Sequence, residues 1–227
     1  MRQALLLLAD SRLPAGGHAH SGGVAPAVEA GLVGGQTKND NDLRDVVGFL
    51  RGRLHTAGLL AGAVAARAAY LAGTGTTDWA ELDAEVDART PAPAQRAVSR
   101  AQGRALLRVA RRAFPDARLK ALGDHPHHPM MLGVAVQIAG GTPAEAAEIA
   151  VAGAISGPAS AAVRLLGLDP LALTAAQMAL AAEADAVALQ AASYADQTTD
   201  ALPAPSAPLL DLLAQAHARS EVRLFAS

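Results

Sequence analysis

Hydrophobic residues recur at helical spacing along most of the chain. The clearest set lies three and four residues apart: Leu43, Val46, Val47, Leu50 and Leu54. Such spacing puts apolar side chains on one face of a helix. We expect this helix to be capped by Asn41 or Asp42 and to continue to Leu71, with a break near Gly58. No segment shows a convincing strand alternation, so the pattern favours an all-α protein.

Breaker and capping residues predict where further helices begin and end. The expected helices cover residues 25–32, 79–86, 93–114, 130–139, 142–167, 170–194 and 209–219. The strongest start signal is Thr142-Pro143-Ala-Glu145, in which the threonine caps, the proline takes the first helical position and the glutamate completes a capping box. We expect Gly157-Pro158 to bend or break this helix, because proline removes a backbone donor and clashes with the preceding turn.

Composition supports the same fold class. Of 227 residues, 51% are hydrophobic and only 3% aromatic, so small aliphatic residues, alanine above all, must fill the core. Alanine has the highest helix propensity. We therefore predict one domain over residues 1–227, a compact multi-helix bundle of about eight to ten helices, with an apolar and glycine-rich segment at 1–23.

Cysteine content and apolar runs bear on location. The chain has no cysteine, which excludes disulfides and thiolate metal sites and fits a cytoplasmic protein. The run Leu5–Leu8 is too short for a signal peptide. The longest uncharged helical stretch, 149–163, falls short of the roughly 20 apolar residues that a membrane span needs. We expect a cytoplasmic protein that does not enter a membrane.

Charge is unevenly distributed. Residues 89–120 hold nine basic side chains and one acid, Asp116, for a net charge of +8, so the rest of the chain carries −10. Four arginines follow one another at four-residue spacing: Arg96, Arg100, Arg104 and Arg108. Like charges at this spacing repel, so acidic groups in the fold or on a protein partner should compensate them. Nucleic acid is disfavoured by the overall charge of −2 and by the lack of interleaved aromatic residues.

Motifs of common chemistry are missing. The sequence has no P-loop, no H-E-x-x-H zinc motif and no G-x-S-x-G elbow, and we predict neither an enzyme nor a bound cofactor. Two histidine clusters, His18 with His20 and His125 with His127 and His128, lie in loops. Loop histidines are usually solvated or bonded to backbone. Since imidazole binds nickel, a nickel-binding carrier that uses these clusters is the alternative hypothesis.

Several segments, in order along nearly the whole chain, resemble the UreF family of urease accessory proteins. They are Leu5–Gly23 with its glycine-rich end, Ser99–Leu107, His128–Gly133, Ser160–Leu166, Pro208–Asp211 with His217, and Val222–Ser227. The resemblance implies an all-α, non-catalytic protein that binds UreD (also called UreH), usually as a dimer. It also implies that the complex recruits the GTPase UreG and delivers nickel to apo-urease.

The resemblance also indicates which residues bind partners. By motif match they are Pro14, Gly16, Gly17, His18, His20, Ser21, Arg104, Arg164, His217, Arg223, Leu224, Phe225 and Ser227. It implies that the tail, residues 220–227, becomes ordered with UreD and that Arg223 helps form the surface for UreG. His18 and His20 stand where the family has an aromatic pair, so the chain looks like a divergent member. Contacts made by His20 are expected to depend on pH near neutrality.

Overall fold

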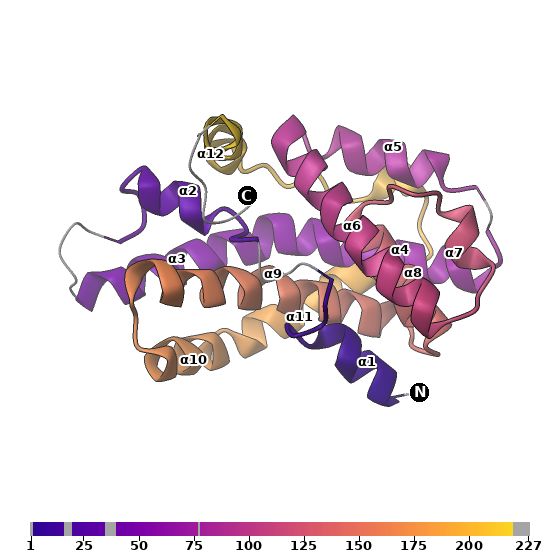
Figure 1. Ribbon diagram of the computed structural model, residues 1–227, viewed down its shortest axis with the longest axis horizontal. Coiled ribbons are helices and arrows are strands. Elements are labelled where there is room, and N and C mark those ends of the chain that lie inside the picture. The colour runs from indigo at the N-terminus through magenta and orange to yellow at the C-terminus, as the bar shows by residue number, and fades with distance from the viewer. Residues whose placement is uncertain (1, 16–19, 35–39, 77, 220–227) are drawn as a thin grey trace.

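The computed structural model describes residues 2–15, 20–34, 40–76 and 78–219, and within these ranges every regular element is a helix (Figure 1). The α-helices are α1 (Arg2–Ala9), α2 (Val24–Glu29), α3 (Asp40–Arg53), α4 (Leu59–Gly73), α5 (Ala80–Ala88), α6 (Pro93–Ala113), α7 (Arg118–Ala121), α8 (His128–Ile138), α9 (Pro143–Leu166), α10 (Pro170–Ala179), α11 (Ala181–Ala192) and α12 (Pro208–Ala218). The π turn η2 spans Leu54–Gly58 and the 3₁₀ turn η3 spans Thr199–Ala201. The prediction of an all-α bundle is confirmed.

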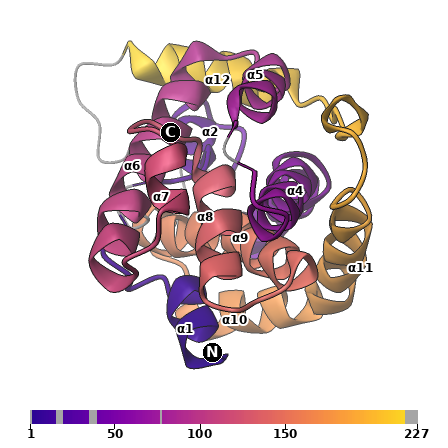
Figure 2. The same ribbon diagram turned by 90° about the vertical axis from the view of Figure 1, so that its right-hand side faces the viewer.

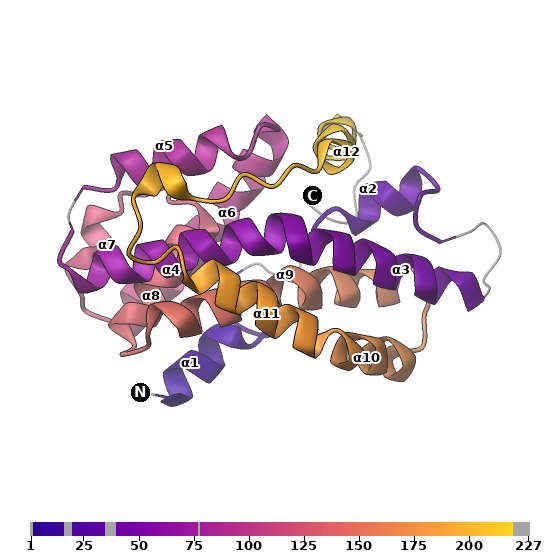
Figure 3. The same ribbon diagram turned by 180° about the vertical axis from the view of Figure 1, so that it is seen from behind.

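Four helices form the centre of the bundle. Helix α4 packs against α8, α9 and α11, and α9 also packs against α8 and α11. Figures 2 and 3 show the other helices around this centre, with α6 outside α8, α10 at one end and α12 across α2 and the start of α6. The termini of the described chain therefore lie on the outside of the bundle.

The central helices approach closely because their contact residues are small. The α4 side of the core is almost entirely alanine, with Ala63, Ala65, Ala66, Ala68 and Ala69 all inaccessible to solvent. On α8, a side chain at Gly133 would collide with the carbonyl oxygen of Ala65. The scarcity of aromatic residues thus leads to a core that gains its stability from tight backbone approach and dispersion contacts.

Helices α3 and α4 are continuous through the π turn η2. The expected break near Gly58 is therefore a widened turn, in which one extra residue enters the helical ladder. The helix begins at Asp40, so Asn41 and Asp42 belong to its first turn, and the prediction that one of them is the cap is wrong.

Helix α9 is continuous through Pro158, so of the two predicted outcomes, a bend or a break, the break does not occur. Proline has no N–H, so the carbonyl of Ala154, four residues earlier, loses its usual helical donor. The Nε–H of Arg53 on α3 donates to that oxygen at 2.9 Å. A side chain from a neighbouring helix thus satisfies the carbonyl that proline leaves without a partner.

Most helix boundaries follow the sequence signals. The capping box at Thr142 is present in full, and the carboxylate of Asp169 accepts the N–H of Leu171 at the start of α10. Helix α9 ends at Gly167, a glycine with φ of 62°. The helix expected over 170–194 is divided at Leu180 into α10 and α11, and the short helices α1 and α7 are additional.

Two helices are long and apolar enough to cross a membrane, judged by length and composition alone: Asp42–Gly73 and Pro143–Leu166. The bent pair α10 and α11 would make a third. The sequence argument against a membrane span counted only the uncharged run 149–163, and the two helices pass the test of length and composition because a few charged residues are allowed in it. Both long helices pack against each other at the centre of the bundle.

Candidate partner-binding site

The glycine-rich loop ends in a tight turn that starts α2. The side chain of Ser21 is inaccessible, and its hydroxyl oxygen accepts the N–H of Ala25 at 3.2 Å. Gly22 and Gly23 have φ of 58° and 95°, a region that costs other residues conformational energy. Ala25 and Ala161 then pack together, with Leu165 beside them. The loop therefore holds α2 against the second half of α9.

Helix α12 is fixed on the other side of α2 by a buried histidine. His217 is 3% exposed, and its Nδ1–H donates to Oε2 of Glu29 at 2.9 Å. Elsewhere on α12, Leu209 and Leu212 are exposed, at 55% and 69%. As Figure 3 shows, α12 lies on the surface beside α2. The arrangement exposes two leucines in the first half of α12.

Arg53 lies beneath the glycine-rich loop. A side chain at Gly22 would meet both the Arg53 guanidinium and Pro158, so Gly22 lies close to each of them. Burial lowers the pKa of Arg53 to about 10. Arg53 thus both donates a hydrogen bond to the Ala154 carbonyl of α9 and lies close to the loop at Gly22.

One histidine from each of the two clusters lies close to the other: His20 and His128. Burial, followed by the charge of nearby His20, lowers the pKa of His128 to about 4. His128 is therefore neutral at physiological pH, and His20 is half-buried beside it. His18 lies outside the described residues, as do Gly16 and Gly17.

His127 is the centre of a hydrogen-bond network that joins α5, α6 and α8. It is inaccessible to solvent; its Nε2–H donates to Oδ1 of Asp87 at 2.8 Å, and its Nδ1 accepts the hydroxyl of Ser99 at 3.0 Å. The Ser99 oxygen in turn accepts the N–H of His128 at 3.3 Å. Burial lowers the pKa of His127 although the bond to Asp87 opposes this shift. The neutral ring with its proton on Nε2 satisfies both neighbours.

Arg100 completes this network. Among the described residues, the network also contains the only group of side chains that could bind a metal ion together. Asp83, Asp87 and His127 offer ligand atoms within 4.8 Å of one another. The guanidinium of Arg100 binds both carboxylates, at 2.8 and 2.9 Å. It already supplies the positive charge that a cation would bring, so the cluster is an internal ion-pair site.

His125 lies apart from this cluster. It is exposed, and its Nδ1 accepts a hydrogen bond from Arg104 at 3.0 Å. The close ligand group includes neither His125 nor His128, and His127 uses both ring nitrogens within the protein. The three histidines therefore do not form one metal-binding group in the structure. The nickel-carrier hypothesis stays a prediction.

The remaining candidate residues lie on three different elements. Pro14 is exposed before the loop, Arg104 is exposed on α6, and Arg164 is exposed in the last turn of α9, where its Nε–H donates to Ser160 O at 3.3 Å. Arg223, Leu224, Phe225 and Ser227 lie outside the described residues. The structure brings His20, Ser21 and His217 to the region around α2, whereas Arg104 lies on α6 and contacts His125.

Sequence reasoning missed several residues that build this region. Glu29, Arg53 and Asp87 carried no motif, and Ser99 belonged to a family-like segment but was given no role of its own. Only Pro158 gave a usable signal, because a proline inside a long apolar helix implies a carbonyl that needs another donor.

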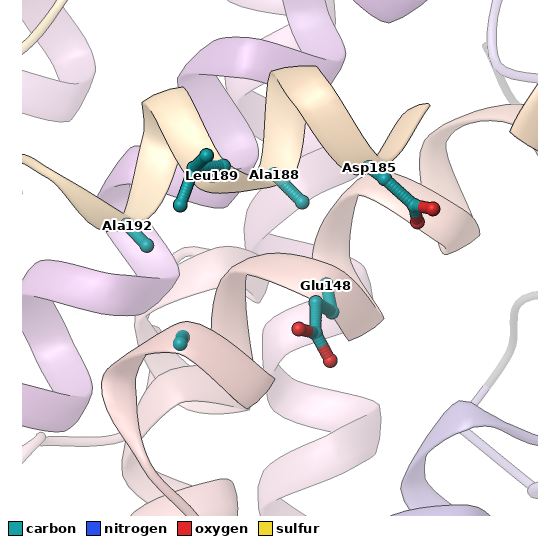
Figure 4. A pocket seen from close by; sticks show the side chains of 6 residues that line it. Glu148, Asp185, Ala188, Leu189 and Ala192 are labelled. Atoms are coloured by element: carbon teal, nitrogen blue, oxygen red, sulfur yellow. The ribbon is translucent and has the colours of Figure 1, made fainter. Parts of the chain in front are cut away.

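A shallow depression of about 120 Å³ lies between α9 and α11 (Figure 4). Its lining is Ala144, Glu148, Asp185, Ala188, Leu189 and Ala192. The close-up shows the carboxylates of Glu148 and Asp185 at one side of it, away from the Ala192 end. The lining includes no histidine or hydroxyl side chain, and it is small beside the ligand pockets of about 300 Å³ or more that are typical of proteins.

Comparison with known proteins agrees with the arrangement of helices and motifs. The UreF family model matches residues 41–181. The urease accessory protein UreF of Mycobacterium sp. (strain JLS) is 47% identical over 223 residues, which cover 98% of this chain and 97% of that protein. The UreF proteins of Mycolicibacterium vanbaalenii and Mycobacterium marinum are each 43% identical, with the same coverage. The chain belongs to the UreF family of urease accessory proteins.

Proposed function

We propose that this protein is a non-catalytic scaffold in the cytoplasm that binds UreD and recruits the GTPase UreG for nickel insertion into apo-urease. Family membership supports a role in urease maturation. The scaffold role is supported by the kind of surface that the molecule offers, which consists of exposed helix faces and a shallow depression.

The observation that carries the proposal is the surface of α12. Leu209 and Leu212 are exposed on a helix that His217 anchors to Glu29. The tail that follows contributes Leu224 and Phe225. Exposed aliphatic side chains on a helix surface are typical of a protein interface, and by sequence the tail adds an aromatic side chain to them. We infer that α12 and the tail together bind UreD, and that Arg223 then contacts UreG.

Co-expression with UreD and UreG tests this proposal. Affinity capture of the wild-type chain should retain both partners, and Arg223→Ala should lose UreG while it retains UreD. Arg219→Ala is the matched control, since Arg219 is exposed at the end of the same helix and should change neither. Unchanged UreG capture by Arg223→Ala would refute the role of that residue, and a chain that captures neither partner would refute the scaffold.

The proposal includes a homodimer of this chain within the complex with UreD, and the outer face of α9 supports it. Gly153 is exposed, and a side chain added at Gly153 or Gly157 would meet no atom within 4 Å. Ala152 and Ser160 are exposed on the same helix. A face of small residues lets a second helix approach closely. Gly153→Arg should shift the mass measured by light scattering from dimer to monomer, while Gly48→Arg on α3, also at an open position, should leave it unchanged.

A further inference from the structure

The series of arginines on α6 continues for five positions at four-residue spacing, and only its first part is neutralised. Arg96 lies 3.8 Å from Asp87, and Arg100 binds Asp83 and Asp87. The arginine ridge, which we define as Arg104, Arg108 and Arg112, continues the series towards the end of the helix. All three of its side chains are exposed.

The ridge has no carboxylate partner among the described residues. Arg104 contacts only His125, at 3.0 Å, whereas Arg108 and Arg112 form neither an ion pair nor a side-chain hydrogen bond there. Residues four apart are neighbours on a helix, so the three cations repel one another. At 1.5 Å per residue the ridge extends for about 12 Å along one face.

Helix α5 shows what neutralises such a series. Asp83 and Asp87 are themselves four residues apart, and they meet Arg100 from a neighbouring helix at 2.8 and 2.9 Å. An acidic helix with carboxylates at four-residue spacing therefore matches an arginine series on α6. Helix α5 ends its acidic run at Asp87, and no equivalent helix covers the ridge in the described part of the chain.

We propose that the arginine ridge is the docking surface for an acidic helix of a partner protein, with carboxylates four residues apart in the manner of Asp83 and Asp87. Single-stranded nucleic acid fits less well, since such surfaces interleave basic side chains with exposed aromatic residues. Phe114, the aromatic residue nearest to the ridge in the sequence, is half-buried and packed on the core.

Fluorescence anisotropy at low salt tests the proposal with the full chain and no urease component, so its outcome is independent of the proposed scaffold role. The probe is a labelled alanine-based helical peptide with glutamate at every fourth position. Arg108→Glu with Arg112→Glu should weaken its binding about tenfold. The control, Arg2→Glu with Arg44→Glu on other exposed positions, makes the same change in net charge and should weaken it less than about twofold.

Three results would overturn the proposal. One is equal weakening by the ridge variant and the control variant. Another is ridge-dependent binding of a 15-residue oligothymidylate that is tighter than binding of the peptide. The third is salt-sensitive self-association that the ridge variant abolishes, since the occupant would then be a second copy of this chain. Circular dichroism of each variant establishes that it is folded.

Discussion

The two halves of α6 carry the same residue at the same spacing in different surroundings. In the first half, Arg96 and Arg100 lie beside α5 and bind its carboxylates. In the second half, Arg104, Arg108 and Arg112 are exposed and pair with no carboxylate in the part of the chain that the structure describes. Figure 1 shows the cause: α5 runs beside only part of α6. The comparison teaches that a charge pattern in a sequence acquires its role from the neighbouring element.

The strongest test of the comparison is Gly103→Ala, at the boundary between the halves. A side chain there would collide with the carbonyl oxygen of Pro126, in the segment that brings His127 to Ser99. Because the obstacle is backbone, we expect a loss of about 3 kcal/mol or more in the free energy of unfolding. Urea denaturation measures it.

Gly48→Ala is the control for this substitution. Gly48 is a helical glycine on α3 with open space around it, and alanine there should raise stability by about 0.5 to 1 kcal/mol. Equal effects of the two substitutions would mean that the approach of Pro126 to α6 is not close.

A direct comparison of the halves uses Arg100→Leu and Arg108→Leu. Loss of Arg100 leaves Asp83 and Asp87 without their guanidinium, and these carboxylates are only partly solvated. We expect a cost of about 2 kcal/mol, below the value for a fully buried pair. Arg108→Leu should change stability by less than about 0.5 kcal/mol. Similar losses in both variants would remove the distinction between the halves.

Acid should destabilise the region beside the first half of α6, where Ser99 contacts the two histidines at the start of α8. His128 has a folded pKa of about 4, below the value of about 6.5 expected in the unfolded chain. The unfolded state therefore binds a proton that the folded state does not, and the free energy of unfolding falls as the pH falls from about 6.5 towards 4. Between pH 7 and pH 5 we expect a loss of about 2 kcal/mol from this residue.

Urea denaturation at both pH values, on the wild type and on His128→Asn, checks this prediction. The variant should show a smaller pH dependence over the same range. An unchanged pH dependence in the variant would assign the effect to His127, whose pKa is also lowered by burial.

The smallest effect is expected within the ridge. Arg108→Gln removes the charge between Arg104 and Arg112 and so relieves like-charge repulsion along the helix. The melting temperature should rise by about 1 °C at low salt, and the gain should disappear in about 0.5 M salt, where screening is strong. A lower melting temperature at low salt would indicate a carboxylate partner for Arg108.

Local signals were sufficient for much of the fold. The capping box at Thr142, the cap at Asp169 and the glycine at Gly167 each specify a helix end through contacts within a few residues. Sequence reasoning also anticipated acidic compensation for the arginines, and α5 supplies it for Arg100. It did not identify which arginines are compensated, because that depends on where α5 packs.

The site was less predictable, because its contacts join distant parts of the chain. His217 and Glu29 are 188 residues apart, and His127 and Asp87 are 40 apart. Neither pair has a spacing rule that could be applied to one sequence. Motif resemblance did point to His20, Ser21 and His217, which the fold gathers around α2, and to Arg104, which lies elsewhere.

The contact between Arg53 and the helix that contains Pro158 has a consequence for sequence change. The arginine replaces a donor that only a proline lacks, across 101 residues of chain. Replacing Pro158 by alanine would restore the helical N–H, and the Ala154 carbonyl would then have two donors available. The effects of substitutions at positions 53 and 158 should therefore not add, and a relative without proline at 158 is free to lose the arginine as well.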